Sequence, residues 1–192
     1  MIRAITFDFW GTLFRDADSD LRQKLRVHAV EQVSGASEDR INRALKAMTD
    51  EFARCHIEEQ RTLTPRDAAL ITTRLLGAEL ADEVVDALAD SFATAILRYP
   101  AVPIDGALDA VCAAAARVPI GLISDTGISP GSSLRALMDR HGFTSYFTAL
   151  TFSDEVGVAK PQRPMFERTA EALGVTPAEI LHIGDLEPTD IA

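Results

Sequence analysis

The sequence has few of the residues that would direct it to nucleic acid, to a membrane or into a disulfide framework. Acidic residues outnumber basic ones by 29 to 19 and the formal net charge is −10, which argues against a nucleic-acid partner and against an anionic membrane surface. No apolar run is long enough to cross a bilayer. Cysteine occurs only at Cys55 and Cys112, without CxxC spacing, so we expect a protein of the reducing cytoplasm with no cysteine metal site.

Lysine is also scarce. Of the 19 basic residues, only Lys24, Lys46 and Lys160 are lysine. A single lysine in a loop is ordinarily a solvated surface charge. Because lysines are so few here, and because a proline follows Lys160 directly, we interpret Lys160 as a functional residue.

Short apolar segments followed by turn signals indicate buried strands, and the chain of 192 residues is long enough for one α/β domain. Four segments have this pattern: residues 2–7, 119–123, 149–152 and 180–183. Helical patterns lie between these strands, at residues 107–117, 133–141 and 164–173. Strands that alternate with helices form parallel sheets, so we expect an α/β fold with a parallel sheet flanked by helices.

The stretch between the first two predicted strands is different, because it contains four amphipathic helical patterns and no convincing strand. Breaks fall near residues 34–37, near 61–64 and at Gly77. The third pattern has a clear start, with Thr64 as a cap and a proline directly after it. We therefore predict an inserted α-helical bundle at residues 15–99 and a sheet core formed by residues 1–14 and 100–192.

Polar side chains follow each predicted strand. They are Asp8 after the first strand, Ser124 and Asp125 after the second, Lys160 after the third, and Asp185 with Asp190 after the fourth. Ligands of open parallel sheets bind beyond the carboxyl ends of the strands, so we expect these groups to share one site. Carboxylates can hold Mg²⁺, and a hydroxyl with a lysine can hold phosphoryl oxygens. In such a site Asp8 can act as a nucleophile.

The same residues resemble the motifs of the haloacid dehalogenase superfamily of hydrolases. The first motif of that family, DxDGT[LV], matches residues 8–13 except at position 10, and the fourth, GDxxxxD, matches residues 184–190. The second and third motifs match Ser124 and Lys160. One such motif alone is a weak signal, whereas four in order are strong. The resemblance implies a Rossmann-like core, and it implies that the helical bundle is the cap of the family.

The resemblance also implies a magnesium site. Asp8 would be the nucleophile and a Mg²⁺ ligand, and Asp185 would be a second ligand. The backbone carbonyl of Trp10 would be a further ligand, which any side chain at that position allows. Asp190 would support the metal site or orient Lys160.

Further residues would bind the substrate, which the resemblance implies to be a small phosphorylated molecule. Ser124 and Lys160 would hold the transferring group, while Gly11 and Thr12 shape the loop that receives it. Asp125 is interpreted as a turn-forming acid that shapes the pocket and not as a metal ligand. The four histidines, His28, His56, His141 and His182, are interpreted as packing or surface residues.

Trp10 is the one departure from the motifs. Phosphatases of the family have an aspartate at this position, which protonates the leaving alkoxide and then activates water. Indole carries a donor N–H that does not titrate near neutral pH, so Trp10 can do neither. Losing a general acid lowers a rate by about 10²–10⁴-fold. We therefore expect a Mg²⁺-dependent phosphatase that forms an aspartyl phosphate at Asp8 and favours activated substrates.

Three alternatives remain open on sequence grounds. The chain can be a catalytically weak or inactive phosphate-binding regulatory protein that keeps the pocket without turnover. It can be a 2-haloacid dehalogenase, a branch of the family with a tyrosine at the position of Trp10, although the acid cluster at residues 184–190 favours the magnesium-dependent branch. It can cleave phosphonates if Lys24 or Lys46 faces the site. Relatives continue beyond the fourth motif, so we also expect a further C-terminal segment after Ala192.

Overall fold

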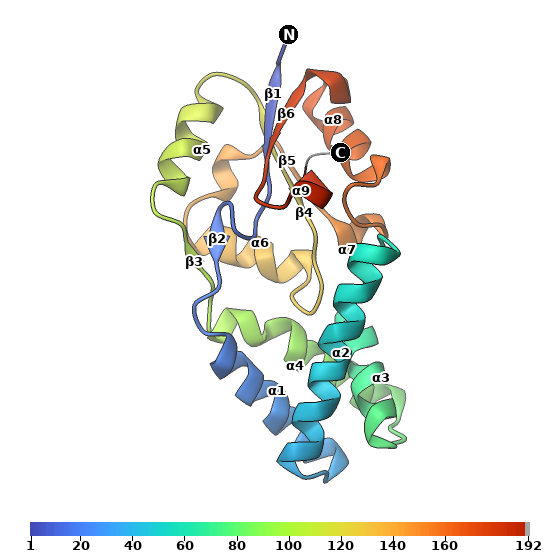
Figure 1. Ribbon diagram of the computed structural model, residues 1–192. Coiled ribbons are helices and arrows are strands. Elements are labelled where there is room, and N and C mark those ends of the chain that lie inside the picture. Colours follow the sequence, from blue (N-terminus) through green and yellow to red (C-terminus); the bar gives the residue numbers. More distant parts are fainter. Residues whose placement is uncertain (191–192) are drawn as a thin grey trace.

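Four parallel strands form the central sheet of the computed structural model, which describes residues 1–190 (Figure 1). The strands are β1 (Ala4–Phe7), β4 (Ile120–Ser124), β5 (Ala149–Phe152) and β6 (Ile180–Ile183), in the spatial order β5-β4-β1-β6. All four predicted strands are confirmed; the bounds of β5 and β6 are those predicted, whereas the ends of β1 and β4 differ by one or two residues. The chain runs outward from β1 through β4 to β5 and then returns to place β6 on the other side of β1. This reversal beside β1 creates the kind of crevice in which α/β proteins bind ligands.

Helices cover both faces of the sheet, as expected. They are α5 (Ala107–Ala115), α6 (Gly131–Arg140) and α8 (Arg163–Leu173). Successive residues of a strand point to opposite faces, and β4 illustrates the result. Leu122 belongs to the main core together with Val111 of α5 and Leu137 of α6, whereas Gly121 faces Thr169 of α8 on the other side.

Short elements lie between the strands of the sheet and after the last of them. They are α7 (Ser153–Val156), α9 (Glu187–Asp190) and the 3₁₀ turns η1 (Thr144–Tyr146) and η2 (Pro177–Glu179). The described chain ends in α9, so the further segment expected after Ala192 lies outside the described residues. Within residues 1–190, none of the helices combines the length and the apolar character needed to cross a bilayer.

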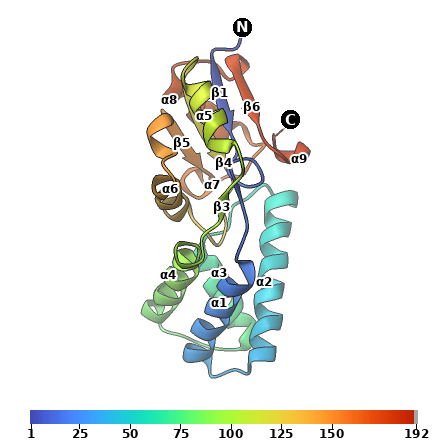
Figure 2. The ribbon, with the colours of Figure 1, turned by 90° about the vertical axis from the view of Figure 1, so that its left-hand side faces the viewer.

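The predicted inserted bundle is confirmed as a cap of four helices, which Figure 2 shows beyond one end of the sheet. The helices are α1 (Ser19–Ser34), α2 (Glu38–Glu58), α3 (Pro65–Leu76) and α4 (Asp82–Arg98). They enclose an apolar core of their own, in which Phe92 of α4 is fully buried. The predicted start of α3 is also confirmed, because the Thr64 side chain accepts a hydrogen bond from the Asp67 backbone and the Asp67 side chain accepts one from the Thr64 backbone.

Two very short strands join the cap to the sheet core, and the sequence did not predict them. They are β2 (Phe14–Arg15) and β3 (Val102–Pro103), which pair antiparallel. A strand of two residues is too short to show a hydrophobic period, so no sequence pattern marks it. The helices of the cap all lie between β2 and β3. The bounds 1–14, 15–99 and 100–192 for core and cap stay a prediction.

The packing of α6 against β5 gives a first test of the fold. A Cβ atom added at Gly131 would lie 2.6 Å from Cγ of Phe152, a fully buried ring. We expect Gly131→Ala to lower the free energy of unfolding by about 1–3 kcal/mol, because overpacking strains a filled core. Urea denaturation measures the change. Ser132→Ala is the matched control, since residue 132 is exposed in the same helical turn. Equal stability of the two variants would contradict the packing described here.

Candidate active site

Asp8 stands at the carboxyl end of β1, where the loop toward the cap begins. Its backbone N–H donates to the carbonyl of Ile183 at the end of β6, 2.8 Å away, and its side chain is almost completely buried. The loop then turns sharply, with Phe14 and Leu13 both donating to the carbonyl of Phe9. Phe9 and Phe14 stack with ring centroids 4.5 Å apart. This aromatic pair anchors the loop, so Asp8 is held at the sheet edge by packing as well as by hydrogen bonds.

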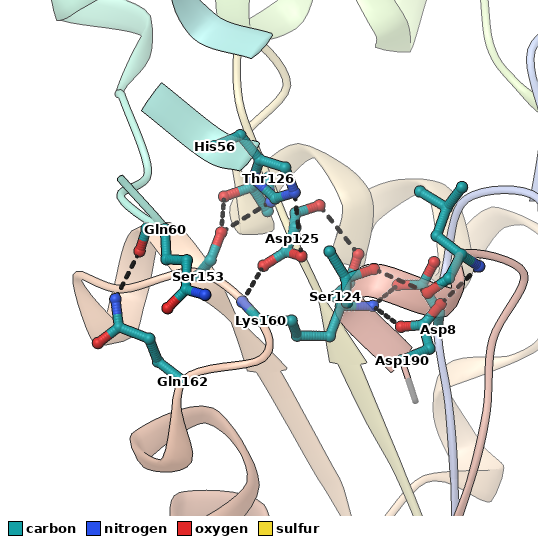
Figure 3. Close-up of polar contacts among 12 residues, drawn as sticks. Asp8, His56, Gln60, Ser124, Asp125, Thr126, Ser153, Lys160, Gln162 and Asp190 are labelled. Carbon is teal, nitrogen blue, oxygen red and sulfur yellow. Dashed lines mark hydrogen bonds and ion pairs between the residues drawn. The ribbon is translucent and has the colours of Figure 1, made fainter. Parts of the chain in front are cut away.

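Lys160 is the centre of the polar cluster shown in Figure 3. Its side chain is only 2% exposed, and its Nζ lies 2.8 Å from Oδ1 of Asp8 and 2.6 Å from Oδ1 of Asp190. The Lys160 backbone N–H donates to Oδ1 of Asp125, 2.8 Å away. Lys160 therefore joins polar groups that follow three different strands, as the sequence motifs predicted for the edge of the sheet.

The burial of this cluster changes its ionisation. Burial raises the pKa of Asp8 to about 6, although Lys160 opposes the shift. Burial also works against the charge of Lys160, but Asp8, Asp125 and Asp190 outweigh it and raise the pKa of the lysine. For Asp190, burial is again opposed by the hydrogen bond from Lys160 and by the Leu186 backbone, and the pKa is lowered. A cation beside Asp8 would favour its charged form.

A carboxylate cluster suited to a divalent ion lies at the same place. Asp8, Asp185 and Asp190 each offer an oxygen, and these atoms all lie within 4.8 Å of one another. Asp190 already accepts hydrogen bonds from Lys160, His182 and the Leu186 backbone, whereas no hydrogen bond or ion pair to the Asp185 side chain occurs within residues 1–190. Oxygen ligands of this kind suit Mg²⁺. The residues present therefore fit a magnesium ion, with Asp185 as the carboxylate that has no other partner in the described part of the chain.

Gly11 makes room for Asp185. Its φ is +70°, a left-handed conformation that favours glycine, and a Cβ atom there would lie 2.1 Å from Oδ2 of Asp185. The glycine of the first motif thus allows the loop after β1 to approach the loop after β6. Any larger residue at position 11 would displace the carboxylate.

A cavity of about 380 Å³ opens above this cluster, between the sheet edge and the cap. Asp8, Lys160 and Asp125 form part of its floor on the core side, and α2 supplies wall residues that include Phe52 and His56. Trp10 also lines the cavity. The indole therefore faces the same space as the predicted nucleophile, at the position where the motif has an acid.

The remaining predicted residues lie around the cavity with different exposures. Ser124 is fully buried at the end of β4, beside β1, and its hydroxyl donates to the Asp125 carbonyl. Thr12 is half-buried in the turn after Gly11 and is not part of the cavity wall. Asp125 has two partners, the Lys160 backbone and, 3.4 Å away, Nε2 of His56. Asp125 therefore connects the lysine loop to the cap and lines the cavity, and its interpretation as a turn-forming acid that shapes the pocket stays a prediction.

The sequence interpretation missed three residues that contribute to the site. His56 at the end of α2 reaches Asp125, and the carbonyl of Gln60 accepts from the Ala159 N–H and from the Gln162 side chain, on either side of Lys160. His182 is packed in β6 as expected, but its Nε2 also lies 3.2 Å from Asp190. Helical periodicity carries no information about which cap residue meets which core loop, so His56 and Gln60 had no signal in the sequence.

The chain as a whole matches the profile of one protein family. That family is the haloacid dehalogenase-like hydrolases, and the match extends over residues 2–192. The chain belongs to this family. The four motifs of the HAD-like hydrolases thus identify it correctly, and the parallel sheet with an inserted helical cap is the architecture that the resemblance implied.

Among curated relatives, this HAD-like hydrolase is similar to two phosphate-ester hydrolases. It is 34% identical to pyrimidine 5′-nucleotidase YjjG of Escherichia coli over 90 residues, which cover 46% of this chain and 39% of YjjG. It is 26% identical to glyceraldehyde 3-phosphate phosphatase of Methanopyrus kandleri, over the whole of this chain and 78% of the relative. The chain therefore spans well under half the length of the first relative and most of the second.

Solved structures agree on the fold of this HAD-like hydrolase. The HAD hydrolase YfnB of Bacillus subtilis, bound to magnesium, superposes with a TM-score of 0.66 at 18% identity, covering 99% of this chain and 81% of YfnB. An L-2-haloacid dehalogenase of Xanthobacter autotrophicus superposes with a TM-score of 0.54 at 22% identity, covering 95% of this chain and 69% of the dehalogenase. A HAD phosphatase of Thermococcus onnurineus superposes with a TM-score of 0.65 at 20% identity, covering 99% of this chain and 80% of the phosphatase. The similarity is therefore evidence for the architecture alone, and the reaction has to be inferred from the residues of the site.

The buried ion-pair cluster makes a prediction about stability. Lys160→Met would leave Asp8 and Asp190 buried without their shared cation, and removal of one partner of a buried pair lowers stability by about 3–5 kcal/mol. We expect a loss of that size in urea denaturation at neutral pH. Lys46→Met is the matched control, because Lys46 pairs with Asp50 on the exposed face of α2 and such pairs contribute little. A Lys160→Met variant as stable as Lys46→Met would contradict the buried cluster.

Proposed function

We propose that this chain is a Mg²⁺-dependent phosphatase that acts on a small phosphorylated metabolite through an aspartyl phosphate at Asp8. The observation that carries the proposal is the buried Lys160, which lies 2.8 Å from Asp8 beside the carboxylate of Asp185. This arrangement combines a nucleophile, a cation for phosphoryl oxygens and carboxylate oxygens that suit Mg²⁺. The two curated relatives named as a nucleotidase and a phosphatase support the same class of reaction.

In the first step, a carboxylate oxygen of Asp8 forms a bond to phosphorus while the bond from phosphorus to the leaving oxygen breaks. In the second step, a water oxygen forms a bond to phosphorus while the bond from phosphorus to the Asp8 oxygen breaks, so that the Asp8 carboxylate is regenerated and the protons of the water leave with inorganic phosphate. Lys160 holds the phosphoryl oxygens throughout and offsets their negative charge, with Asp190 and Asp125 fixing its position. Ser124 and Thr12 are the proposed further hydroxyl donors to the transferring group; neither lines the cavity in this structure, and the Ser124 hydroxyl would have to turn from the Asp125 carbonyl to donate. Asp8, Asp185 and the Trp10 carbonyl would hold Mg²⁺, which would supply positive charge where the two anions meet.

Trp10 determines which phosphates react well. The indole lines the cavity but cannot donate a proton to a leaving alkoxide or take one from water. Aryl phosphates and acyl phosphates release stable anions and do not depend on that proton. We therefore propose that the enzyme prefers activated phosphates to alkyl phosphates.

The proposed reaction is tested with a panel of phosphorylated metabolites assayed for phosphate release with Mg²⁺. We expect release from at least one aryl or acyl phosphate, and loss of at least 10³-fold in Asp8→Asn (~4 kcal/mol of transition-state stabilisation). EDTA is expected to abolish the activity, and Mg²⁺ to restore it.

Other outcomes of the panel would contradict the proposal. Phosphate binding without any release would favour the inactive binding protein, for which Trp10 in the place of the acid is the supporting observation. Halide release from 2-haloacids in EDTA would favour the dehalogenase. Circular dichroism of Asp8→Asn serves as the control for folding.

The role of position 10 is tested by restoring an acid there. Trp10→Asp is expected to raise kcat/KM for alkyl phosphates by about 10-fold or more, because a general acid contributes about 10²–10⁴-fold and part of this is lost with the packing of the indole on Phe9. Trp10→Asn is the matched control, with the same size and no proton to transfer. Equal rates for the two variants would show that the missing acid does not limit turnover.

A further inference from the structure

A second cavity, of about 310 Å³, lies where α1 meets the core. Its wall combines groups of the cap and the core: Trp10, Arg22, Arg26, Phe52, Gly127 and Ser129. Three of these residues, Trp10, Phe52 and Gly127, also line the cavity above Asp8. The two cavities therefore adjoin each other, and Trp10 borders both.

One of the two arginines in the second cavity is fully engaged within the protein. Arg22 is 4% exposed, donates to the carbonyl of Tyr99 at 2.7 Å and forms an ion pair with Asp16. Tyr99 follows α4 and Asp16 precedes α1, so Arg22 joins the two ends of the cap. A structural role accounts for Arg22 completely.

Arg26, one turn further along α1, is different. Its Nε is buried without any hydrogen-bond partner, and within residues 1–190 no carboxylate forms an ion pair with its guanidinium. Burial, together with the nearby charge of Arg22, lowers the pKa of Arg26 to about 10. Asp16 lies on the same side but is taken by Arg22. Two arginines therefore lie near one aspartate that pairs only with Arg22, in a protein whose net charge is −10.

An unpaired guanidinium in such a place is unfavourable for folding. A partly buried charge without a partner loses hydration that nothing replaces, and in proteins it is normally paired. The guanidinium has a planar fork of donors that matches a carboxylate or a phosphate with two parallel hydrogen bonds. Destabilising features of this kind are typical of binding sites, where a ligand supplies the missing partner.

We propose that Arg26 binds a second oxyanion of the substrate, so that the substrate carries a phosphoryl group above Asp8 and a carboxylate or second phosphate in the cavity beside Trp10. The proposal rests on the proposed function only for the identity of the first group. It assigns to α1 of the cap a residue that determines specificity. The substrate class becomes a small phosphorylated molecule with two anionic ends.

Binding to phosphonates, which the enzyme cannot hydrolyse as phosphate esters, tests this proposal without turnover. The probes are alkyl phosphonates of two to five carbons that end in a methyl group, in a carboxylate or in a second phosphonate, with binding measured by calorimetry in the presence of Mg²⁺. We expect one doubly anionic probe to bind about 10-fold or more tightly than the methyl-terminated probe of equal length, since hydrogen bonds to charged groups contribute this much. The carboxylate and phosphonate series distinguish the two kinds of oxyanion.

Variants of Arg26 connect the preference to this side chain. Arg26→Met is expected to remove the preference, and Arg26→Lys to restore part of it. Arg43→Met is the matched control, because Arg43 pairs with Asp39 on the exposed face of α2, and it should keep the full preference. No preference in the wild-type chain, or a preference that survives Arg26→Met, would overturn the proposal.

Stability gives an independent readout. We expect Arg26→Met to unfold at the same urea concentration as the wild type or at a higher one, because methionine removes an unpaired charge and replaces the apolar stem of the arginine. A clearly lower midpoint would mean that Arg26 has a structural partner, and would overturn the proposal as well. If the chain prefers doubly anionic probes but releases no phosphate from any substrate, only the proposed phosphatase activity is refuted. If it releases phosphate but does not prefer doubly anionic probes, only the proposed Arg26 site is refuted.

Discussion

The buried ammonium group of Lys160 is the interaction on which the site depends. It contacts carboxylates from the loops after β1 and β6, and its own loop follows β5, so three segments far apart in the sequence meet at one charge. Like-charged carboxylates repel strongly when water is excluded, and the lysine makes their approach possible. The parallel sheet supplies the geometry, because it brings the carboxyl ends of β1 and β6 side by side. The same charge that holds these carboxylates together is suited to phosphoryl oxygens, so one group could serve both folding and binding.

The cap forms part of the wall of both cavities. Its helices have a core of their own, yet α2 also supplies a wall of the cavity above Asp8 and α1 supplies the arginine beside it. Under the proposed function, the core would hold the groups that act on phosphorus, and the cap would hold groups that contact the rest of the substrate. A division of this kind explains how one sheet can serve reactions as different as phosphate-ester hydrolysis and dehalogenation, both of which occur among proteins of this fold.

Much of this architecture could be predicted from the sequence, because its signals are local. Four apolar segments gave the strands, helical periodicity gave the cap, and motifs fixed to strand ends gave Asp8, Lys160 and the acid cluster around Asp185. The contacts between cap and core could not be predicted. His56, Gln60 and Arg26 look like ordinary polar residues of helical segments, and only the docking of the cap shows what they face. The two-residue strands β2 and β3 are too short to show a sequence pattern, and they pair because the segments on either side of them bring them together.

The carbonyl of Gln60 has a consequence for how the cap can move. It accepts hydrogen bonds from the Ala159 N–H and the Gln162 side chain, which flank Lys160, and Gln60 itself has the uncommon backbone φ of +50° for a residue other than glycine. Lifting this end of α2 would break both bonds and admit water to the lysine at the same moment. A movement that opens the cavity would therefore weaken the electrostatic interactions inside it, and a movement that closes the cavity would strengthen them. An open cap would place ligands in a high-dielectric site, and a closed cap would place them in a low-dielectric one.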